Sequence, residues 1–403
     1  MDPDQAEHLP GDAPLKILYH HRVGSKDGQA VHIGSLITAL RRAGHDVSVV
    51  SPPAFGKVDF GGQSQWLGRM KRLLPRAGYE LAEMCYNVPA LWRLQRTRQR
   101  FRPDLIYERY NLFMIAGVVF ARLHRIPIFL EVNSPLARER AAFGGLAFPH
   151  MAAWLERRTW RAVDLLLPVS QVLAEIVRQA GVPPERIVVI PNGIDDEDFR
   201  CPSSDSAKQT LGLAGKTVLG FVGFVREWHG LDSVLDLLTD PHCPHDLHLL
   251  IVGDGPALPA LKAQAERLGI APRVTFAGLV ERGQLTRYLA AFDIALQPRA
   301  VGYASPLKLF EYMAAGKAIV APSQPNIREV LVDGETGLLF NCGDDADFRR
   351  AVLDLAHARP LRERLGAGAR CAIIERGYTW ANNARRIGEM YGRVAQSRSK
   401  KAR

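Results

Sequence analysis

The chain has 403 residues, 47% of them hydrophobic, with 52 Lys and Arg against 42 Asp and Glu. This is enough apolar sequence for two domains of ordinary size, each with its own core. The positive balance suggests an anionic partner, such as a nucleotide, a nucleic acid or an anionic membrane surface. Five dispersed cysteines without a CxxC pair argue against a disulfide framework or a zinc site and fit a reducing cytoplasm.

The polar, acidic start of the chain differs from a signal peptide. No uncharged apolar run reaches the roughly 18 residues of a membrane-spanning helix. We therefore expect a cytoplasmic protein, with a peripheral position at the inner face of the plasma membrane as a second possibility.

Short runs rich in Val, Ile and Leu alternate with helical stretches twice along the chain. The runs are 15–19, 47–50, 104–107, 126–131, 165–169 and 187–190, and then 218–222, 247–252, 274–276, 294–297, 318–321 and 338–340. Such runs are typical of parallel strands with helices on both faces. The sequence predicts an α/β protein with two Rossmann-like, doubly wound parallel sheets, which bind ligands at the carboxyl ends of their strands.

The predicted domains are 1–196 and 215–378, joined by a linker over 197–214. The linker is placed there because the stretch is polar and has little apolar periodicity. Residues 379–403 are expected to form a last helix and a basic tail. If the two domains face each other, the cleft between them is the site.

The first strand is followed by a loop with two glycines, Gly24 and Gly28, and then by a helix expected over 31–43. Glycines let a backbone approach a ligand closely, and Gly28 is nearest to the helix start. The loop lacks the GxGxxG dinucleotide pattern. A plain tight connection is the alternative interpretation.

The segment 66–102 is strongly basic and interleaved with apolar and aromatic residues. Its basic residues are Arg69, Lys71, Arg72, Arg76, Arg93, Arg96, Arg98, Arg100 and Arg102. Such a face could rest on anionic lipid, and a pair of ordinary surface helices is the alternative. No nucleic-acid partner is expected, because no nucleic-acid-binding motif accompanies the charge.

Two strands of the first half end in polar residues, Glu108 with Arg109 and Glu131 with Asn133. We expect these side chains at the cleft, where they could hold an acceptor or the hydroxyls of a sugar. A lone Glu108 or Glu131 near the reaction centre could act as a base. Capping of the core or packing between domains is an equal alternative for each.

Two cation candidates, Arg226 and His229, follow the first strand of the second half. A cation there would stabilise the charge of a departing diphosphate, and Arg226 suits phosphate better because its charge is permanent. A structural ion pair of Arg226 with Glu227 or Asp232 is the alternative. The Val-Gly-Asp-Gly turn at Gly253 lacks a third glycine and a Walker lysine, so we interpret it as a strand-to-helix turn with ligand contact as the lesser possibility.

The stretch from Tyr303 to Gly316 predicts a helix with a defined start and end. Ser305 is predicted as its N-cap and Pro306 as its first helical residue. Gly316 is predicted as the left-handed residue just past the end. The free backbone N–H groups at such a start bind anions.

Glu311 lies about 7 Å along this helix at ~1.5 Å per residue. At that distance from a bound phosphate, a carboxylate is placed for a diol such as a nucleotide ribose. The alternative is a core helix on which Lys308 and Glu311 form a surface ion pair.

Taken together, these stretches resemble the retaining glycosyltransferases of family 4, which have the GT-B fold. The matching stretches are 166–170, 189–195, 221–230, 250–255, 305–316 and 333–340. The resemblance implies transfer of a sugar from a nucleotide-diphosphate sugar with retained configuration and without a metal or other cofactor. The acceptor would be a glycan, a lipid-linked molecule or a small molecule, in a setting such as envelope or exopolysaccharide synthesis.

The resemblance also implies roles for single residues. Glu311 corresponds to the second acid of a Glu-x7-Glu pair, which holds the ribose, and Gly28 to the loop that closes over the phosphates. The backbone of Ser305, Pro306 and Leu307 corresponds to the diphosphate loop, although Pro306 has no N–H. The last helix, about 380–394, would cross back to the first domain.

The residues and the family resemblance together give further candidates for the site. Arg226, Lys308 and Glu311 are the candidate catalytic residues. Gly223, His229, Gly253 and Tyr303 are further donor-side candidates. The candidates on the acceptor or sugar side are His32, Arg109, Glu131 and Asn133.

Two departures from the family pattern stand out. The first acid of the Glu-x7-Glu pair falls on Tyr303, which questions the usual sugar contact. The usual arginine and lysine of the diphosphate site fall on Phe224 and His229, and Arg226 and Lys308 are candidates to supply that charge. A non-catalytic nucleotide-sugar-binding protein and a nucleotide-sugar epimerase of the same fold therefore remain alternatives. For a transferase we favour a mechanism in which the departing phosphate helps to deprotonate the acceptor.

Overall fold

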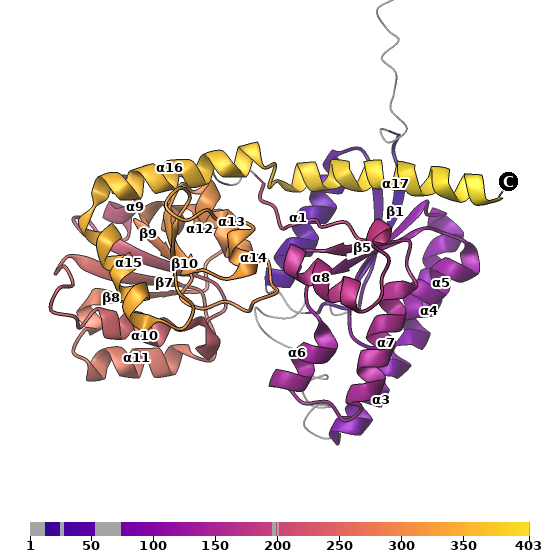
Figure 1. Cartoon of the computed structure of the whole chain (residues 1–403), viewed down its shortest axis with the longest axis horizontal. Coiled ribbons are helices and arrows are strands. Elements are labelled where there is room, and N and C mark those ends of the chain that lie inside the picture. Colours follow the sequence, from indigo (N-terminus) through magenta and orange to yellow (C-terminus); the bar gives the residue numbers. More distant parts are fainter. Residues whose placement is uncertain (1–12, 25–27, 53–73, 196–198, 200, 403) are drawn as a thin grey trace, which may run out of the picture. The chain divides into compact units, whose positions relative to one another are not determined.

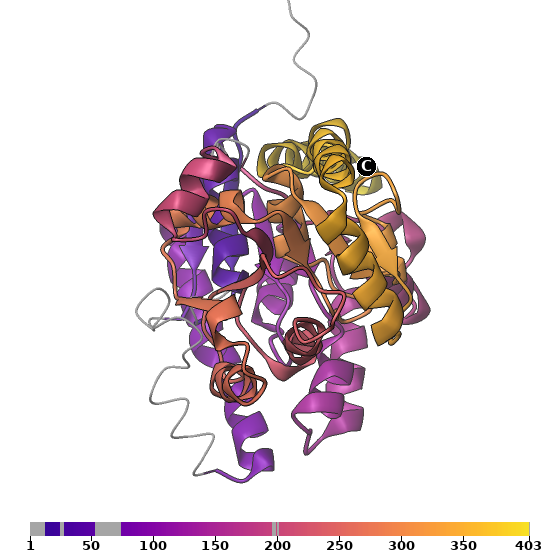
Figure 2. The ribbon, with the colours of Figure 1, turned by 90° about the vertical axis from the view of Figure 1, so that its left-hand side faces the viewer.

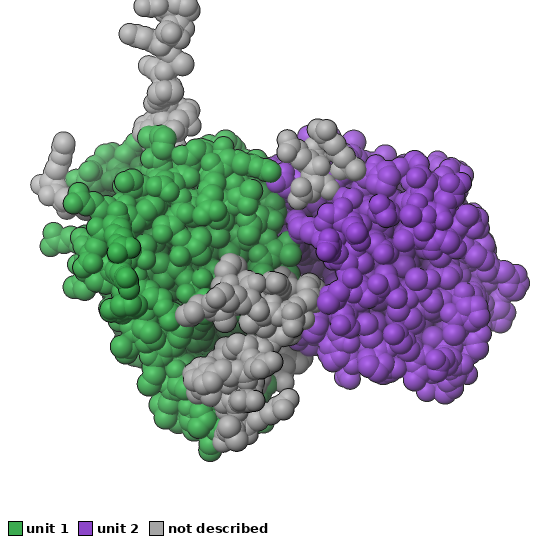
Figure 3. Space-filling view, turned by 180° about the vertical axis from the view of Figure 1, so that it is seen from behind, with its two compact units in different colours: residues 1–191, 380–403 green, residues 192–379 purple. Residues whose placement is uncertain are grey.

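The structure is a computed structural model that describes residues 13–24, 28–52, 74–195, 199 and 201–402. The chain divides into two compact units, which Figure 3 shows in two colours. Unit 1 consists of Met1–Pro191 and Trp380–Arg403, and unit 2 of Asn192–Thr379.

Unit 1 contains a five-stranded parallel sheet in the order β2-β1-β3-β4-β5. The strands are β1 (Lys16–His20), β2 (Asp46–Val50), β3 (Leu105–Arg109), β4 (Ile128–Val132) and β5 (Leu165–Pro168). The helices are α1 (Gly28–Arg42), α3 (Arg76–Cys85), α4 (Asn87–Phe101), α5 (Ala116–His124), α6 (Leu136–Phe143), α7 (Pro149–Arg161), α8 (Gln171–Gln179) and α17 (Trp380–Ala402).

Both faces of the unit 1 sheet are buried. Leu18, Ile106 and Leu130 point to one face, where they pack with residues of α4, α5, α7 and α8. Alternate residues of the same strands point to the other face, because side chains alternate along a strand. There the Glu131 carboxylate accepts a hydrogen bond from His32 of α1. Both faces thus carry buried polar groups, because Glu108 lies on the same face as Ile106 and approaches α5 at Gly117, while Glu131 lies under α1.

Unit 2 contains a six-stranded parallel sheet in the order β11-β10-β9-β6-β7-β8. The strands are β6 (Thr217–Val222), β7 (Leu247–Val252), β8 (Val274–Gly278), β9 (Ile294–Leu296), β10 (Ala318–Pro322) and β11 (Leu338–Phe340). The helices are α9 (Ser204–Thr210), α10 (Leu231–Leu237), α11 (Leu258–Arg267), α12 (Arg282–Ala291), α13 (Leu307–Ala314), α14 (Pro325–Arg328), α15 (Asp345–His357) and α16 (Arg359–Glu375).

Each face of the unit 2 sheet has its own core, as the helices on both sides of the strands indicate (Figure 1, Figure 2). Leu219 and Phe221 of β6 pack with α10, α11 and α15. Val218 of the same strand packs with the face that carries α9, α12 and α13. This alternation explains the continuous apolar runs in the sequence, because both faces of each strand are buried.

The predicted α/β fold with two parallel sheets is confirmed. Eleven of the twelve predicted runs are strands, and the run 187–190 is not. That run lies beside β5, where Val188 N–H donates to Leu166 O at 3.0 Å and Ile190 N–H to Pro168 O at 3.0 Å. The pairing amounts to one isolated bridge, between Leu166 and Ile187, and Pro191 follows without an N–H to extend it.

The stretch 197–214, expected as a linker, is structured over its described residues. Residues 197, 198 and 200 lie outside the described residues, but Phe199, Ala207 and Leu213 are buried in the core of unit 2. The boundaries between units fall at Pro191 and Thr379. The last helix, α17, starts at the expected residue and contacts α1 within unit 1.

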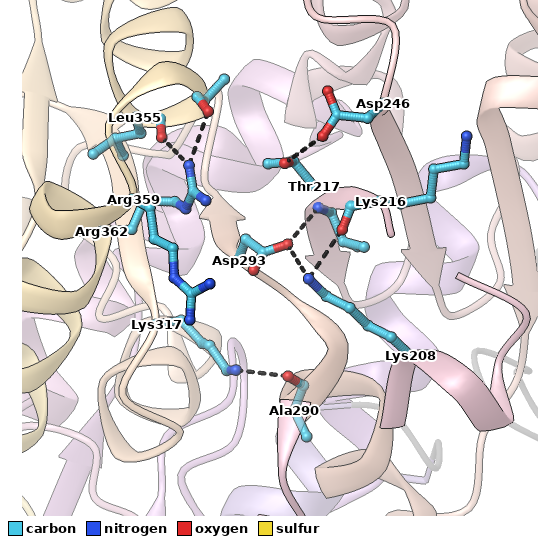
Figure 4. A network of polar contacts seen from close by, with 12 residues as sticks. Lys208, Lys216, Thr217, Asp246, Ala290, Asp293, Lys317, Leu355, Arg359 and Arg362 are labelled. Atoms are coloured by element: carbon cyan, nitrogen blue, oxygen red, sulfur yellow. Dashed lines mark hydrogen bonds and ion pairs between the residues drawn. The ribbon is translucent and has the colours of Figure 1, made fainter. Parts of the chain in front are cut away.

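A partly buried ion pair joins this stretch to the sheet of unit 2, as Figure 4 shows. Lys208 of α9 donates to the Asp293 carboxylate at 2.6 Å and to the carbonyl of Lys216 at 3.0 Å. Asp293 also accepts the N–H of Val218, at 2.7 Å, where β6 begins. One carboxylate thereby joins α9 to the sheet.

We expect Lys208→Met to lower the free energy of unfolding by about 1–3 kcal/mol, because it leaves Asp293 largely buried with one donor fewer. Lys216→Met is the control, since that side chain is exposed and should change stability by less than about 0.5 kcal/mol. Urea unfolding of both variants measures this. Equal stabilities would show that the stretch is not fastened by this pair.

Candidate functional site

The candidate residues of unit 2 follow the carboxyl ends of three neighbouring strands. Gly223 to His229 follow β6, Gly253 follows β7, and residues 297–306 follow β9. Because β9, β6 and β7 are adjacent and parallel, these loops emerge at one edge of the sheet. This is the edge at which open parallel sheets bind ligands.

The helix predicted after Tyr303 exists, but its start is shifted by one residue. Pro306 is the N-cap, with an extended backbone, and α13 begins at Leu307. The predicted cap at Ser305 is therefore wrong. Its Oγ is buried without a hydrogen bond, and its carbonyl accepts from the Asn192 side chain at 2.6 Å. Tyr303 lies half-buried in the same loop.

The end of α13 is as predicted. Gly316 has φ +64°, in the left-handed region. Its N–H donates to Met313 O at 2.9 Å, and the N–H of Lys317 donates to Tyr312 O at 3.0 Å. This pair of bonds is a Schellman motif, which satisfies the last carbonyls of the helix.

The loop before α13 is held by amide side chains that the sequence analysis missed. Asn326 of α14 donates to the carbonyls of Val301 and Ala304, at 3.0 and 2.7 Å. Gln324 donates to the carbonyl of Ala300 at 3.0 Å. Sequence gives no signal for these residues, because their partners are backbone groups brought near by the fold.

The charged ends of Lys308 and Glu311 both lie in the interior of unit 2. The surface ion pair considered for these two residues is therefore absent. The ammonium nitrogen of Lys308 is buried without a hydrogen bond, 3.8 Å from the centre of the Phe221 ring. Burial lowers the pKa of Lys308 to about 7, against the opposing effect of Glu311. Glu311 is 6% exposed, and burial raises the pKa of its carboxyl while Arg282 and Lys308 oppose the shift.

The Arg226 guanidinium lies over two aromatic rings, 4.9 Å from the centre of Phe224 and 4.5 Å from that of Trp228. Among the described residues it forms no ion pair with Glu227 or Asp232, the alternative considered for it. Its side chain is half-buried, and its charge is held by π-faces instead of a carboxylate.

His229 is held as a neutral ring. Its Nδ1 accepts the backbone N–H of Arg226 at 3.1 Å, and its ring meets that of Phe221 edge-on at 5.1 Å. Burial lowers the pKa of His229 to about 2, with further lowering from Lys308 and Arg226. The residue at this position therefore orders the loop and carries no positive charge at neutral pH.

The glycines after β6 and β7 allow two loops to pack closely. Gly223 and Gly253 have φ of +142° and +127°. A Cβ at Gly253 would lie 2.0 Å from the carbonyl oxygen of Gly223. Gly253 is thus required by packing, which is what the strand-to-helix interpretation expects.

In unit 1, the four candidates for the acceptor or sugar side form one cluster around Glu131. This buried carboxylate accepts four hydrogen bonds, from His32 (2.9 Å), Tyr107 (2.8 Å), Arg109 (2.5 Å) and Asn133 (2.6 Å). Burial alone would raise the pKa of Glu131, but His32 and Arg109 hold it well below its usual range. Because Glu131 is ionised and saturated with donors, it is unsuited to take a proton.

Glu108, the other candidate base, is fully buried. Its Oε2 lies 2.5 Å from Nδ1 of His20, a partner that the sequence analysis missed. Gly117 of α5 allows this approach, because a Cβ there would lie 1.7 Å from the same oxygen. Gly28 is the first residue of α1, and a Cβ there would meet no atom within 4 Å.

The basic segment is described from residue 74, so 66–73 lie outside the described residues. Helix α4 buries Ala90 and Leu94 in the core of unit 1. On its exposed side Val88 is 71% and Trp92 60% exposed, and the Arg96 guanidinium lies over the Trp92 ring at 5.4 Å. Among the described helices, none combines the length and apolar character needed to span a bilayer.

Two family descriptions match this chain. "Glycosyltransferase Family 4" matches residues 26–198, and "Glycosyl transferases group 1" matches residues 216–358. The chain belongs to the family 4 glycosyltransferases. It is therefore a glycosyltransferase with the GT-B architecture, and both expectations are confirmed.

Curated relatives agree with this assignment. A D-inositol 3-phosphate glycosyltransferase of Xylanimonas cellulosilytica is 26% identical over 93% of this chain and 94% of its own length. A phosphatidyl-myo-inositol mannosyltransferase of Mycobacterium leprae is 35% identical over 53% of this chain and 55% of its own length.

Solved structures support the fold of this glycosyltransferase. HepE from Anabaena, in complex with UDP, has a TM-score of 0.72 at 20% identity, covering 93% of this chain and 99% of its own. The same protein in complex with UDP-glucose has a TM-score of 0.70.

We expect Glu131→Gln to lower the free energy of unfolding by about 3 to 5 kcal/mol at pH 7, because it leaves Arg109 buried without its charge partner. The pKa of Glu131 lies below that of an unfolded glutamate. Its contribution to stability is therefore present above about pH 4.3 and is lost as the pH falls further.

Urea unfolding at pH 7 and at about pH 2.5 measures this difference. Glu175→Gln is the control, since Glu175 is an exposed partner of Arg178 in the same unit. A loss no greater than that of the control would contradict the role of Glu131 as the centre of the cluster.

Proposed function

We propose that this glycosyltransferase moves a sugar from a nucleotide-diphosphate sugar to a hydroxyl acceptor with retention of configuration. The observation that carries the proposal is Glu311. This acid is buried one turn into α13 and forms no hydrogen bond or ion pair within the described chain. A buried carboxylate without a partner is costly to a protein, so its presence beside ligand-binding loops points to a ligand.

A ribose fits this position. Its two hydroxyls would donate to the Glu311 carboxylate, while the diphosphate would lie toward the start of α13. There the backbone of Leu307 and the buried hydroxyl of Ser305 are available as donors. UDP is the first nucleotide to test, because HepE was solved with UDP and with UDP-glucose.

The acceptor half of the proposal rests on unit 1. His32, Arg109, Glu131 and Asn133 form a polar cluster at the carboxyl ends of β3 and β4, where a sugar or acceptor hydroxyl could bind. None of the acids considered there is a free base, since Glu131 is saturated with donors and Glu108 is paired with His20. This supports a mechanism in which an oxygen of the departing phosphate takes the acceptor proton, with no metal.

A glycan, a lipid-linked molecule or a small molecule could supply the hydroxyl, and envelope or exopolysaccharide synthesis is a fitting setting. A peripheral position on the cytoplasmic membrane face is part of the proposal. Trp92 and Val88 on α4 are exposed apolar residues among arginines, a combination suited to an anionic lipid surface.

Glu311→Gln should weaken UDP binding by about 10- to 100-fold, because it removes a charged acceptor of two ribose hydroxyls. Isothermal titration with UDP, GDP, ADP, CMP and dTDP identifies the nucleotide, and product analysis with donor and candidate acceptors identifies transfer. The control is Glu266→Gln, at an exposed position of α11. Unchanged affinity in Glu311→Gln would sink the ribose assignment, and donor turnover without an acceptor would favour an epimerase.

Trp92→Ser should weaken binding to vesicles that contain phosphatidylglycerol by several-fold, since burial of a tryptophan ring is lost. The matched control is Trp154→Ser, because Trp154 is also exposed, at 51%, with Arg158 over its ring. Co-sedimentation at low and physiological salt measures both. Equal loss in the two variants would show that the α4 face is not the contact.

A further inference from the structure

The loop after β6 lacks the positive charges that the family resemblance places on it. The two positions are occupied by Phe224, an aromatic residue, and by His229, whose buried ring is neutral at physiological pH. Arg226 is charged, but its guanidinium lies over two aromatic rings, those of Phe224 and Trp228. A diphosphate at the end of β6 would therefore need a cation from elsewhere.

Lys308 brings an ammonium group to this place from another element. It belongs to α13, yet its nitrogen lies 3.8 Å from the centre of the Phe221 ring on β6. The His229 ring packs against the same phenyl ring, at 5.1 Å. A Cβ at Gly223 would lie 3.2 Å from the Lys308 nitrogen. The ammonium thus lies beside the loop in which the missing charge was expected.

The surroundings of this ammonium are incomplete. It is buried and has no hydrogen-bond acceptor, and the Ser305 hydroxyl near the start of the same helix is likewise buried without a partner. The Phe221 ring offsets part of the cost of burying a charge but accepts no ordinary hydrogen bond. Up to three N–H donors of the lysine are therefore available to an anionic ligand.

We infer that Lys308, reaching from α13 to the end of β6, binds the diphosphate of the donor in place of the cation expected at position 229. This inference rests on the proposed function. In the transfer step the bond from the sugar carbon to the phosphate oxygen breaks, and its electron pair stays on that oxygen. The acceptor oxygen bonds to the carbon, and its proton passes to the departing phosphate. Lys308 stabilises the growing phosphate charge and exchanges no proton.

Because the positive charge would come from Lys308, we predict that the affinity for UDP depends on pH. The titratable groups that interact with the ammonium are Glu311 on its own helix and His229 from the loop after β6, and Arg226 acts on the same His229 ring. Burial lowers the pKa of Lys308 to about 7, so the amine is charged below that pH and increasingly neutral above it. Affinity for UDP should fall as the pH rises from 7 to 9, by up to about tenfold per unit. A permanently charged Arg226 acting alone would give no such fall.

Lys308→Met tests the contact to the phosphates of the ligand separately from the contact to its ribose. We expect it to weaken UDP binding by about 10- to 100-fold and to leave uridine binding unchanged, because only the phosphates contact the amine. Glu311→Gln should weaken both ligands, since both contain the ribose. Lys262→Met is the matched control, because Lys262 also lies over an aromatic ring, Phe276 at 5.5 Å, but is exposed.

Two more results distinguish a binding role from a structural one. Lys308→Met should raise the melting temperature of the free protein, because it replaces a buried, unpartnered amine with an apolar side chain. Adding His229→Lys to Lys308→Met should restore part of the UDP affinity, because it returns the charge to the loop after β6.

The outcomes are separable. If wild type binds UDP and Glu311→Gln does not, but Lys308→Met binds UDP normally, the inference is wrong and the proposed function stands. Equal weakening of UDP and uridine by Lys308→Met also overturns it. If wild type binds no nucleotide, the proposed function fails and the inference fails with it.

Discussion

Helix α13 carries a lysine and a glutamate into a buried position without pairing them, and unit 2 is arranged around that constraint. The residues from Leu309 to Ala314 are all buried, so the helix cannot rotate to expose either charge. The Tyr312 hydroxyl accepts the backbone N–H of Val222 at 2.9 Å, which joins the helix to the end of β6. The same bond fixes the distance between the lysine and the loop after β6.

Burying two opposite charges apart is less stable than pairing them or replacing them with apolar residues. The cost is of the kind that proteins retain at functional sites, where a ligand later supplies the missing partner. Unit 1 shows the opposite arrangement. There the buried acid Glu131 has four donors, so its cluster is complete without a ligand and offers a fixed polar surface. The contrast is between two buried acids, Glu311 without a hydrogen-bond donor among the described residues and Glu131 with four.

The sequence predicted the elements that depend on local pattern. Both parallel sheets follow from continuous apolar runs, and the end of α13 follows from Gly316, the residue type that tolerates a left-handed backbone. The start of α13 was off by one residue, because Asn192 and Asn326 hold the preceding loop through backbone carbonyls. The run 187–190 has strand composition but only a single bridge to β5.

Contacts between distant elements could not be predicted from spacing. Residues 308 and 311 are three apart on a helix, which favours an ion pair at the surface. The fold instead places Lys308 over Phe221, 87 positions earlier in the chain. Likewise, His20 and Glu108 meet only because β1 and β3 are neighbours in the sheet, with these two residues in register.

Whether a cationic side chain comes from a helix or from a loop affects how precisely it is positioned. A lysine in a loop has its own side-chain freedom and that of the loop, whereas Lys308 projects from a helix in which the residues from Leu309 to Ala314 are all buried. Its long side chain reaches β6, where the ammonium lies over the Phe221 ring. The ring contacts the ammonium but accepts no ordinary hydrogen bond from it. If Lys308 replaces a loop cation, as we propose, the replacement exchanges adaptability for a defined position. The lowered pKa of that lysine follows from the same burial, so positional precision and pH sensitivity have one physical cause.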